Sequence, residues 1–394
     1  MNALRKLVDN LKPSFSEGGK LEKLHWVFDS LETFLFTPGH ATNTGSHIRD
    51  PIDLKRTMFM VILAMVPCLL FGMWNVGHQH YLALGQFLAP ADGLMDKFLF
   101  GALKVLPIVV VSYGVGLGIE FLFCSINKHP IQEGFLVSGM LIPLVMPVDV
   151  PLWMVAVGTA FAVVIGKEVF GGTGMNVLNV ALTARAFLFF AYPTMMSGDK
   201  VWVNVSTAAG EQVVDGFSGA TSMGHAAVGN MAGVVPLMDS FWGLEAGSIG
   251  ETSAFACLLG AALLIFTGIG SWRIMLSVFL GGVAMAGIFN LVGPGLNNAY
   301  MQIPVMHQLM LGSFFFGMVF MATDPVTATQ TSTGKWIYGF FIGLLAILIR
   351  VVNPAYPEGM MLAILFMNVM APVIDHYVVQ ANIKRRVKRA ALAA

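Results

Sequence analysis

Long apolar stretches separated by short polar connections are the feature that most limits what this chain can fold into. A helix crosses the hydrocarbon core of a bilayer with about 20 mostly apolar residues, and a shorter segment can do so where protein covers its ends. Ten such stretches occur, at residues 57–76, 99–123, 133–147, 152–166, 175–192, 252–268, 273–292, 305–322, 336–351 and 358–378. Only 11% of the 394 residues are charged, against roughly 25% in soluble domains. We therefore expect an all-helical, polytopic membrane protein and not a water-soluble enzyme.

Basic residues are concentrated at the two ends of the chain, and this sets the expected orientation. The N-terminal segment, residues 1–56, contains Arg5, Lys6, Lys12, Lys20, Lys23, Arg49, Lys55 and Arg56. The C-terminal tail, residues 379–394, contains Lys384, Arg385, Arg386, Lys388 and Arg389. Cytoplasmic segments carry the excess of Lys and Arg in membrane proteins. Both ends are therefore predicted to be cytoplasmic, which requires an even number of crossings. The formal net charge is zero, so we expect no attraction to nucleic acid.

The largest connection, residues 193–251, is predicted to lie outside and divides the ten spans five and five. A half with an odd number of spans must be inverted in its second copy, so we expect inverted repeats at 57–192 and 252–378. Weak sequence echoes agree, because Met146–Pro151 ends the third span and Met321–Val326 ends the eighth. This architecture resembles that of urea and ammonium channels, so a solute channel or transporter stays open as an alternative function.

Apolar residues at helical spacing precede the first span, and they predict an amphipathic helix on the cytoplasmic surface. These residues are Leu21, Leu24, Phe28, Leu31 and Leu35. Such a helix either packs at the periphery or covers a lipid-soluble substrate that enters from the membrane.

The external connection contains a short motif, Asp215-Gly216-Phe217-Ser218-Gly219-Ala220-Thr221. Residues of these types are common in ordinary turns, so the motif alone is a weak signal. Its chemical merit is the Thr221 hydroxyl, which has neighbours too small to hinder an approaching enzyme. A phosphate-bearing group can be esterified at such a position.

With this motif the whole chain resembles the B subunits of the sodium-translocating NADH:quinone oxidoreductases, which are redox pumps of the bacterial inner membrane. The other resembling stretches are Arg49–Arg56, Glu133–Gly139, Met146–Pro151 and Gly166–Asn176, the last continuing through Asn179 to Arg185. Val180 departs from the family, in which we expect proline. The D subunit of the Rnf complex is a related alternative that shares the membrane core and the flavin threonine. The long N-terminal segment favours the sodium-translocating NADH:quinone family.

The resemblance implies the cofactors and partners. It implies FMN joined through its phosphate to Thr221 by a periplasmic flavin transferase, with Asp215, Ser218, Gly219 and Ala220 in the recognised motif. It also implies a noncovalent riboflavin, ubiquinone, Na⁺ and the other subunits of the complex. Electrons are then expected to enter at the periplasmic FMN from a partner flavin and to reach ubiquinone near the cytoplasmic face.

Ionisable residues within or beside the spans are further candidates, since each is costly in hydrocarbon unless it is paired or wetted. For an ion pathway the candidates are Glu120, Asp324 and Asp375, whose carboxylate oxygens suit a hard cation. Stabilisation of a helix end is the alternative explanation for each. Arg185, in the fifth span, either pairs with a carboxylate such as Glu358 or faces the bound flavin through charge-assisted hydrogen bonds, and we favour the flavin.

A quinone site is predicted where the cytoplasmic ends of the second and third spans meet. The candidates there are Gly116, Glu133, Gly134 and Phe135. Helix packing mediated by the glycines is the alternative explanation for these residues. No metal site is expected, because the three cysteines lie singly in apolar runs.

Overall fold

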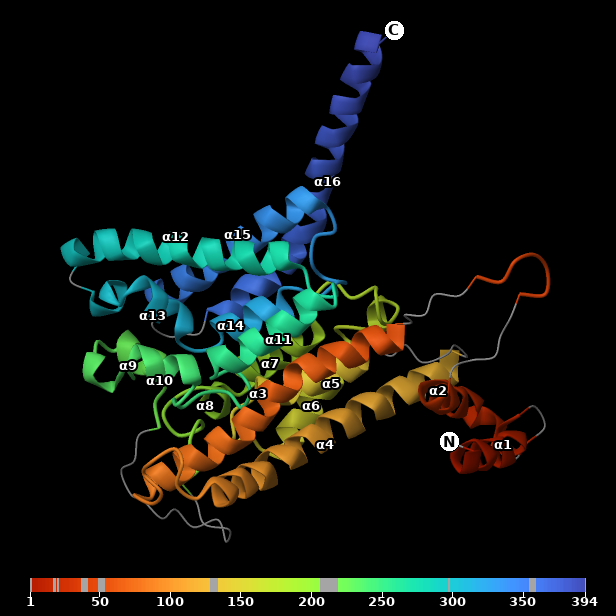
Figure 1. Ribbon diagram of the computed structural model, residues 1–394, viewed down its shortest axis with the longest axis horizontal. Helices are drawn as coiled ribbons and strands as arrows, with labels where there is room; N and C mark the ends of the chain where they lie inside the picture. Colours follow the sequence, from red (N-terminus) through yellow and green to blue (C-terminus); the bar gives the residue numbers. More distant parts are fainter. Residues whose placement is uncertain are drawn as a thin grey trace.

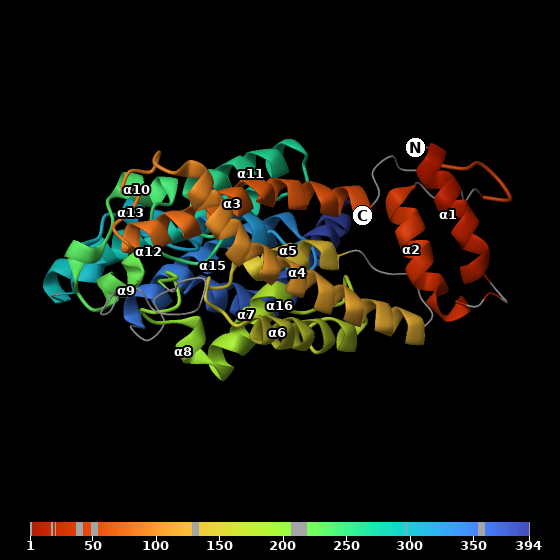
Figure 2. The same cartoon turned by 90° about the horizontal axis from the view of Figure 1, so that it is seen from below.

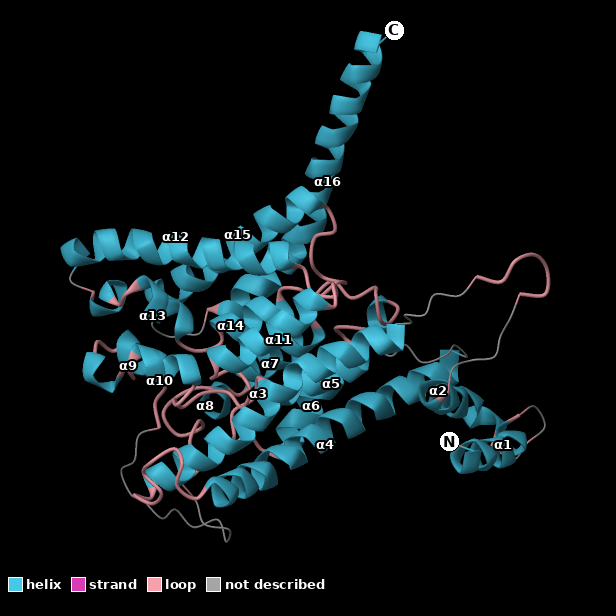
Figure 3. Ribbon diagram, in the orientation of Figure 1, coloured by secondary structure: helices cyan, strands magenta, loops and turns pink. Residues whose placement is uncertain are grey.

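Helices account for all regular structure in the part of the chain that the computed structural model describes, which is residues 2–16, 19, 21–36, 42–48, 54–127, 134–205, 219–296, 298–353 and 359–393. No strand occurs among these residues, as Figure 3 shows. The main helices are α3 (Leu54–Ala83), α4 (Leu94–Asn127), α5 (Phe135–Leu144), α6 (Leu152–Val164), α7 (Val180–Ala191), α11 (Ala254–Phe266), α12 (Trp272–Leu296), α15 (Ser332–Val352) and α16 (Met360–Ala393). The shorter ones are α8 (Pro193–Met196), α9 (Ser222–Ala227), α10 (Leu237–Trp242), α13 (Val305–Met310) and α14 (Phe314–Phe316). The expectation of an all-helical chain is confirmed for the described residues.

Helix length and composition support a multi-pass membrane protein. Among the described residues, six helices are long and apolar enough to cross a membrane. They are Leu54–Ala83, Leu94–Asn127, Leu152–Phe170, Trp272–Leu296, Ser332–Val352 and Met360–Leu392. Three further apolar helices, α5, α7 and α11, are shorter. Helix is present in each of the ten predicted ranges, but ten crossings and two inverted repeats stay predictions.

Two of the predicted spans end at or close to the sequence echoes, as expected, and each is followed by irregular backbone. In the first, α5 ends at Leu144 and the chain continues without regular structure to Pro151. In the second, α14 continues as a π-helical turn over Gly317–Met321 and then loses regular structure as far as Thr331. Irregular backbone is tolerated at membrane depth only where protein covers it, and Leu144, Met146 and Met321 are all buried.

Different helices lie at the two ends of the bundle. Figures 1 and 2 both show α1 (Asn2–Phe15) and α2 (His25–Leu35) beyond the start of α3, while α9, α10 and α13 lie at the other end. Thr221 immediately precedes α9. The N-terminal helices and the threonine of the external motif therefore lie at opposite ends of the bundle.

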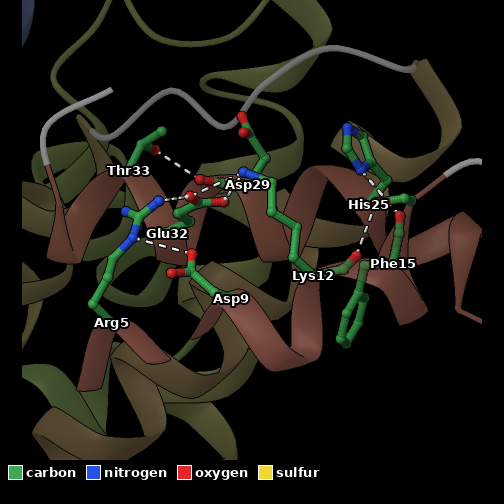
Figure 4. Close-up of polar contacts among 9 residues, drawn as sticks. Arg5, Asp9, Lys12, Phe15, His25, Asp29, Glu32 and Thr33 are labelled. Carbon is green, nitrogen blue, oxygen red and sulfur yellow. Dashed lines mark hydrogen bonds and ion pairs between the residues drawn. The ribbon is translucent and has the colours of Figure 1, made fainter. Parts of the chain in front are cut away.

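The N-terminal segment forms a helical hairpin, of which the apolar pattern predicted only the second helix. Glu32 of α2 accepts hydrogen bonds from Arg5 at 3.1 Å and from Lys12 at 2.8 Å, both from α1, as Figure 4 shows. The rings of Phe15 and Phe28 stack between the helices, with centroids 4.7 Å apart. The other apolar residues of the predicted stripe remain exposed, namely Leu21, Leu24, Leu31 and Leu35. These exposed leucines are the surface expected of an interfacial helix.

The last helix is longer than the sequence pattern predicts. A span over 358–378 and a separate basic tail were expected, but α16 continues unbroken from Met360 to Ala393. Its final turns extend away from the bundle (Figure 1) and their side chains are exposed. The basic residues therefore lie on a rigid extension of the final span.

Glycines allow α12 and α15 to pack closely. A Cβ atom at Gly281 of α12 would collide with the backbone oxygen of Phe340, and one at Gly343 of α15 would collide with that of Val278. Small residues at helix contacts permit such close approach in membranes. Gly287 also lies in α12, but a Cβ there would meet nothing within 4 Å. The contact therefore depends on particular glycines of the helix.

This difference yields a matched pair of variants in one helix. We expect Gly281→Ala to destabilise the protein by about 1–3 kcal/mol, the usual cost of overpacking. We expect Gly287→Ala to be neutral or slightly stabilising, because alanine is about 1 kcal/mol better than glycine in a helix. Thermal unfolding in detergent measures both changes. Equal losses of stability in the two variants would contradict the proposed close contact.

Candidate functional site

Thr221 lies at the start of α9 and acts as its N-cap. Its Oγ1 accepts a hydrogen bond from the backbone N–H of Gly224 at 3.1 Å, which satisfies one of the free donors of a helix start. The preceding turn is fixed by the N–H of Gly219, which donates to the carbonyl oxygen of Asp199 at 2.8 Å. Asp215 and Ser218 of the predicted motif lie outside the described residues. The C-terminal part of the motif is thus held in a defined conformation.

A small cavity with polar walls lies beside Thr221. The centres of water molecules can occupy about 20 Å³ of it, which is room for about one water molecule. The oxygen-bearing side chains in its wall are Thr221, Ser222, Glu245, Ser248, Glu251, Thr252 and Ser313. We refer to it as the outer cavity. Most of its polar groups come from the loop between α10 and α11.

That loop, residues 243–253, is held inside the bundle by backbone hydrogen bonds. The N–H groups of Ile249 and Gly250 donate to the carbonyl oxygens of Met146 at 3.2 Å and Leu144 at 2.8 Å. These carbonyls lie where α5 ends and have no helical partner of their own. The amide of Asn75, in α3, donates to the carbonyl oxygen of Glu245 at 3.0 Å. The end of α5 inside the bundle and the burial of the loop therefore depend on each other.

Arg185 of α7 pairs with a carboxylate from this loop. Its Nη1 atom lies 2.9 Å from Oε2 of Glu251 and donates to the Ser248 hydroxyl at 3.2 Å. Both charged side chains are only about 5% exposed. Glu358, the partner considered from the sequence, lies outside the described residues. Glu251 lines the outer cavity together with Thr221, which places the ion pair beside that threonine. A contact between Arg185 and a flavin stays a prediction.

Glu245 is a second buried carboxyl group of the outer cavity. Its Oε1 accepts a hydrogen bond from the N–H of Gly312 at 3.1 Å, and its Oε2 has no hydrogen-bond partner among the described residues. Burial raises the pKa of Glu245 to about 7, although the Gly312 N–H, the Ser222 hydroxyl and the charge of Arg350 favour the ionised form. This carboxyl group therefore titrates near neutral pH.

A larger cavity is lined by α5 and by the segment that follows the π-helical turn. It contains about 820 Å³ of empty space, counting its open mouth, of which the centres of water molecules can occupy about 90 Å³. Its walls are mainly apolar, as in sites that bind small molecules. The polar residues in its wall are Thr57, Ser138, Lys167, Thr173, Asn176, Asn179, Thr323 and Asp324. Two of the lining residues, Thr57 and Met58, lie near the start of α3. We refer to it as the central cavity.

Asp324 is the predicted ion-pathway residue that lines the central cavity. Its Oδ2 accepts hydrogen bonds from the amide of Asn179 and the hydroxyl of Thr327, both at 3.2 Å. Its Oδ1 accepts from the N–H of Val326 at 3.0 Å. Asn179 is also the N-cap of α7, because its Oδ1 accepts from the N–H of Leu182 at 3.1 Å. One side chain thus joins the start of α7 to Asp324.

The other two predicted ion-pathway residues already have protein partners. Glu120 forms a buried ion pair with Lys167. Asp375 accepts hydrogen bonds from the N–H of Gln330 at 2.7 Å and of Thr331 at 3.1 Å, which fixes the start of α15. Stabilisation of local structure therefore accounts for Asp375.

The predicted quinone residues divide between two environments. Gly116 packs directly against the ring of Phe135, which is completely buried. Gly134 instead lines the central cavity, where a Cβ would collide with Thr173. Glu133 lies outside the described residues. A contact of Gly116 or Phe135 with quinone would require their packing to open.

Sequence reasoning did not identify Lys167, Glu245 or Glu251 as site residues. Their partners are distant in sequence, 47 residues for Lys167–Glu120 and 66 for Arg185–Glu251. The only local signal is that Glu251 directly precedes an apolar stretch.

The Arg185–Glu251 pair can be tested by removing one charge or both. Loss of one member of a buried pair costs about 3–5 kcal/mol, because the other charge remains buried without compensation. We therefore expect Glu251→Gln to lower the unfolding temperature in detergent, and Arg185→Met combined with Glu251→Leu to be less destabilised. A double variant as unstable as the sum of its single variants would show that the two residues act independently.

Comparisons with known proteins show the family of this chain. The NQR2, RnfD, RnfE family model matches residues 41–384. The B subunit of the Na⁺-translocating NADH-quinone reductase from Stutzerimonas stutzeri is 48% identical, over 98% of this chain and 99% of the relative. The corresponding protein from Pseudomonas aeruginosa is 49% identical over the same shares, and that from Chromohalobacter salexigens is 46% identical over 98% and 96%. The chain belongs to the NQR2, RnfD, RnfE family and, within it, to the B subunits of the Na⁺-translocating NADH-quinone reductases.

Proposed function

We propose that this subunit carries electrons inward across the bacterial inner membrane to ubiquinone, in a complex with the other subunits of the reductase, and that this transfer drives Na⁺ translocation. The observation that carries the proposal is the placement of two sites at different depths of one bundle. Thr221 lies at the end opposite the N-terminal helices, and the central cavity lies near the start of α3. With both termini cytoplasmic, this arrangement supports a route from the periplasmic side towards the cytoplasmic side.

FMN is proposed to be attached to Thr221 through a phosphoester, added by a periplasmic flavin transferase. The residues fit such a group in size, because Gly219 and Ala220 present almost no side chain beside the hydroxyl. In charge the surroundings are mixed, because Glu245 and Glu251 line the outer cavity with Thr221 and Arg185 is paired with Glu251. Bound FMN supplies electron transfer, and the protein supplies its position and electrostatic surroundings. Thr221 is 8% exposed, so we expect the transferase to act before or during closure of this region.

The central cavity is the proposed site of the noncovalent riboflavin. The part of it that water centres can occupy, about 90 Å³, is smaller than the roughly 300–1,000 Å³ typical of small-molecule sites. We therefore expect the wall side chains to move apart as the ring enters. The apolar part of the walls suits a flat aromatic ring. The amides of Asn176 and Asn179 suit hydrogen bonds to the ring and to the hydroxyl groups of riboflavin. Lys167 adds a cation at one side.

Asp324 is the proposed Na⁺ ligand of this subunit. Glu120 and Asp375 are committed to an ion pair and to a helix start, whereas Asp324 lines the central cavity. A carboxylate in a low-dielectric region binds a cation more strongly when negative charge increases nearby. Ubiquinone is proposed to react near the cytoplasmic ends of α4 and α5, beside Gly134.

A denaturing gel tests the flavin attachment. Wild-type protein from a host that has the flavin transferase is expected to give a fluorescent band, and Thr221→Ala is expected to abolish it. Ser222→Ala changes the adjacent hydroxyl and should retain the band. Mass spectrometry of the tryptic peptide then locates the added group. A dark wild-type band would overturn the redox proposal and favour the channel alternative.

Filling the central cavity tests the noncovalent flavin. Ser138→Leu adds bulk to its wall and is expected to remove most of the flavin that acid extraction releases. The covalent band at Thr221 should be unchanged. Met140→Leu, also in α5 but outside the cavity wall, is the matched control. If Ser138→Leu retains its full content of extractable flavin, the noncovalent flavin binds elsewhere.

A further inference from the structure

The outer cavity contains a carboxyl group to which the proposed electron route assigns no role. Glu245 is 4% exposed and lines the same small space as Thr221. One of its oxygens is fixed by the N–H of Gly312 at 3.1 Å. The other, Oε2, has no hydrogen-bond partner in the described part of the chain. A buried acceptor of this kind is costly unless it receives a proton or another partner.

The charges around Glu245 come from several elements of the fold. Glu251 of the same loop is paired with Arg185 of α7. Arg350 of α15 acts on Glu245 through space, and Ser222 of α9 contributes only a neutral hydroxyl. With Glu245 ionised, the two arginines and the two glutamates cancel. With Glu245 protonated, the group carries one net positive charge.

We propose that Glu245 is a proton-binding residue of the flavin-attachment site, which holds a proton when Thr221 carries the phosphodiester. The inference rests on the proposed attachment of FMN. A phosphodiester brings one negative charge to the wall of a cavity that already holds a carboxylate. Two like charges in one poorly solvated space repel strongly. Uptake of one proton by the carboxylate, from the external aqueous phase, removes this repulsion without any transfer of electrons.

The small size of the outer cavity favours a proton over a larger group as the partner of Glu245. The cavity has space for about one water molecule, and the carboxylate of Glu251 is already satisfied by Arg185. Burial raises the pKa of Glu245 to about 7 in the chain without flavin. A neighbouring negative charge raises this pKa further. Attachment near neutral pH is therefore accompanied by proton uptake.

The pH dependence of stability follows from this shift. The pKa of Glu245 is higher in the folded chain, about 7, than the usual value of 4.5, so the folded state binds the proton more tightly. The resulting contribution to stability is fully present below about pH 4.5 and is lost as pH rises through about 7. With the phosphodiester present, this loss should move to higher pH.

The experiment compares full-length protein, in its complex, from hosts with and without the flavin transferase. In-gel fluorescence first establishes loading, and the unfolding temperature is then measured from about pH 5.5 to about pH 9. In the wild type we expect loading to move the pH-dependent loss of stability upward by about one pH unit or more. Glu245→Gln, which is neutral at all pH values, should lack this shift. Asp239→Asn, which replaces an acid of the same external segment outside the cavity wall, should retain it.

A second measurement covers the case in which Glu245→Gln does not fold. Infrared difference spectra between high and low pH should show a protonated carboxyl band in loaded protein, and Glu245→Asp should displace its frequency. Identical pH profiles for loaded and flavin-free wild type would overturn the inference, as would a carboxyl band unaffected by Glu245→Asp. Absence of the fluorescent band would instead refute flavin attachment itself, and it would be seen before any pH measurement.

Discussion

The buried ion pair between Arg185 and Glu251 is the interaction on which the arrangement of both sites depends. Removing two charges from water costs several kcal/mol for each ion, and only good geometry with added hydrogen bonds compensates this cost. The 2.9 Å contact and the bond to Ser248 provide both. Glu251 belongs to the connection before α11, whereas Arg185 belongs to α7. The pair therefore requires residues 243–253 to lie against α7 inside the bundle.

Once this loop is inside, its position determines much of the surrounding structure. Its N–H groups satisfy the carbonyls at the end of α5, which allows that helix to stop within the bundle. Its two glutamates provide the acidic wall beside Thr221. A further small cavity is bounded by Arg185, Glu251 and Met321, and Met321 precedes Asp324 by three residues. The polar lining of this further cavity is limited to Arg185, Glu251 and Ser313, and its other lining residues are apolar or glycine.

The sequence predicts the parts of this structure that depend on local composition. Hydropathy locates the ten helical ranges, and the motif directs attention to Thr221. The sequence does not predict that Ile249 and Gly250, from a distant loop, donate to the free backbone carbonyls where α5 ends. Nor does it separate Glu245, which is buried with one carboxyl oxygen lacking a partner, from Asp239, an acid of the same external segment. That distinction depends on Asn75 and Gly312, which lie far from Glu245 in sequence and next to it in the fold.

Helix α7 connects the two proposed sites mechanically. At its start, Asn179 caps the helix and donates to Asp324 in the central cavity. Six residues later, Arg185 holds Glu251 in the wall of the outer cavity. At about 1.5 Å per residue, these two points are about 9 Å apart along the helix axis. A change of charge at Asp324 alters the hydrogen bond that fixes the start of α7. The same short helix carries Arg185, whose ion pair holds the loop beside Thr221. The proposed coupling of ion binding to electron transfer therefore needs no long chain of side chains, because one short helix contacts both proposed sites.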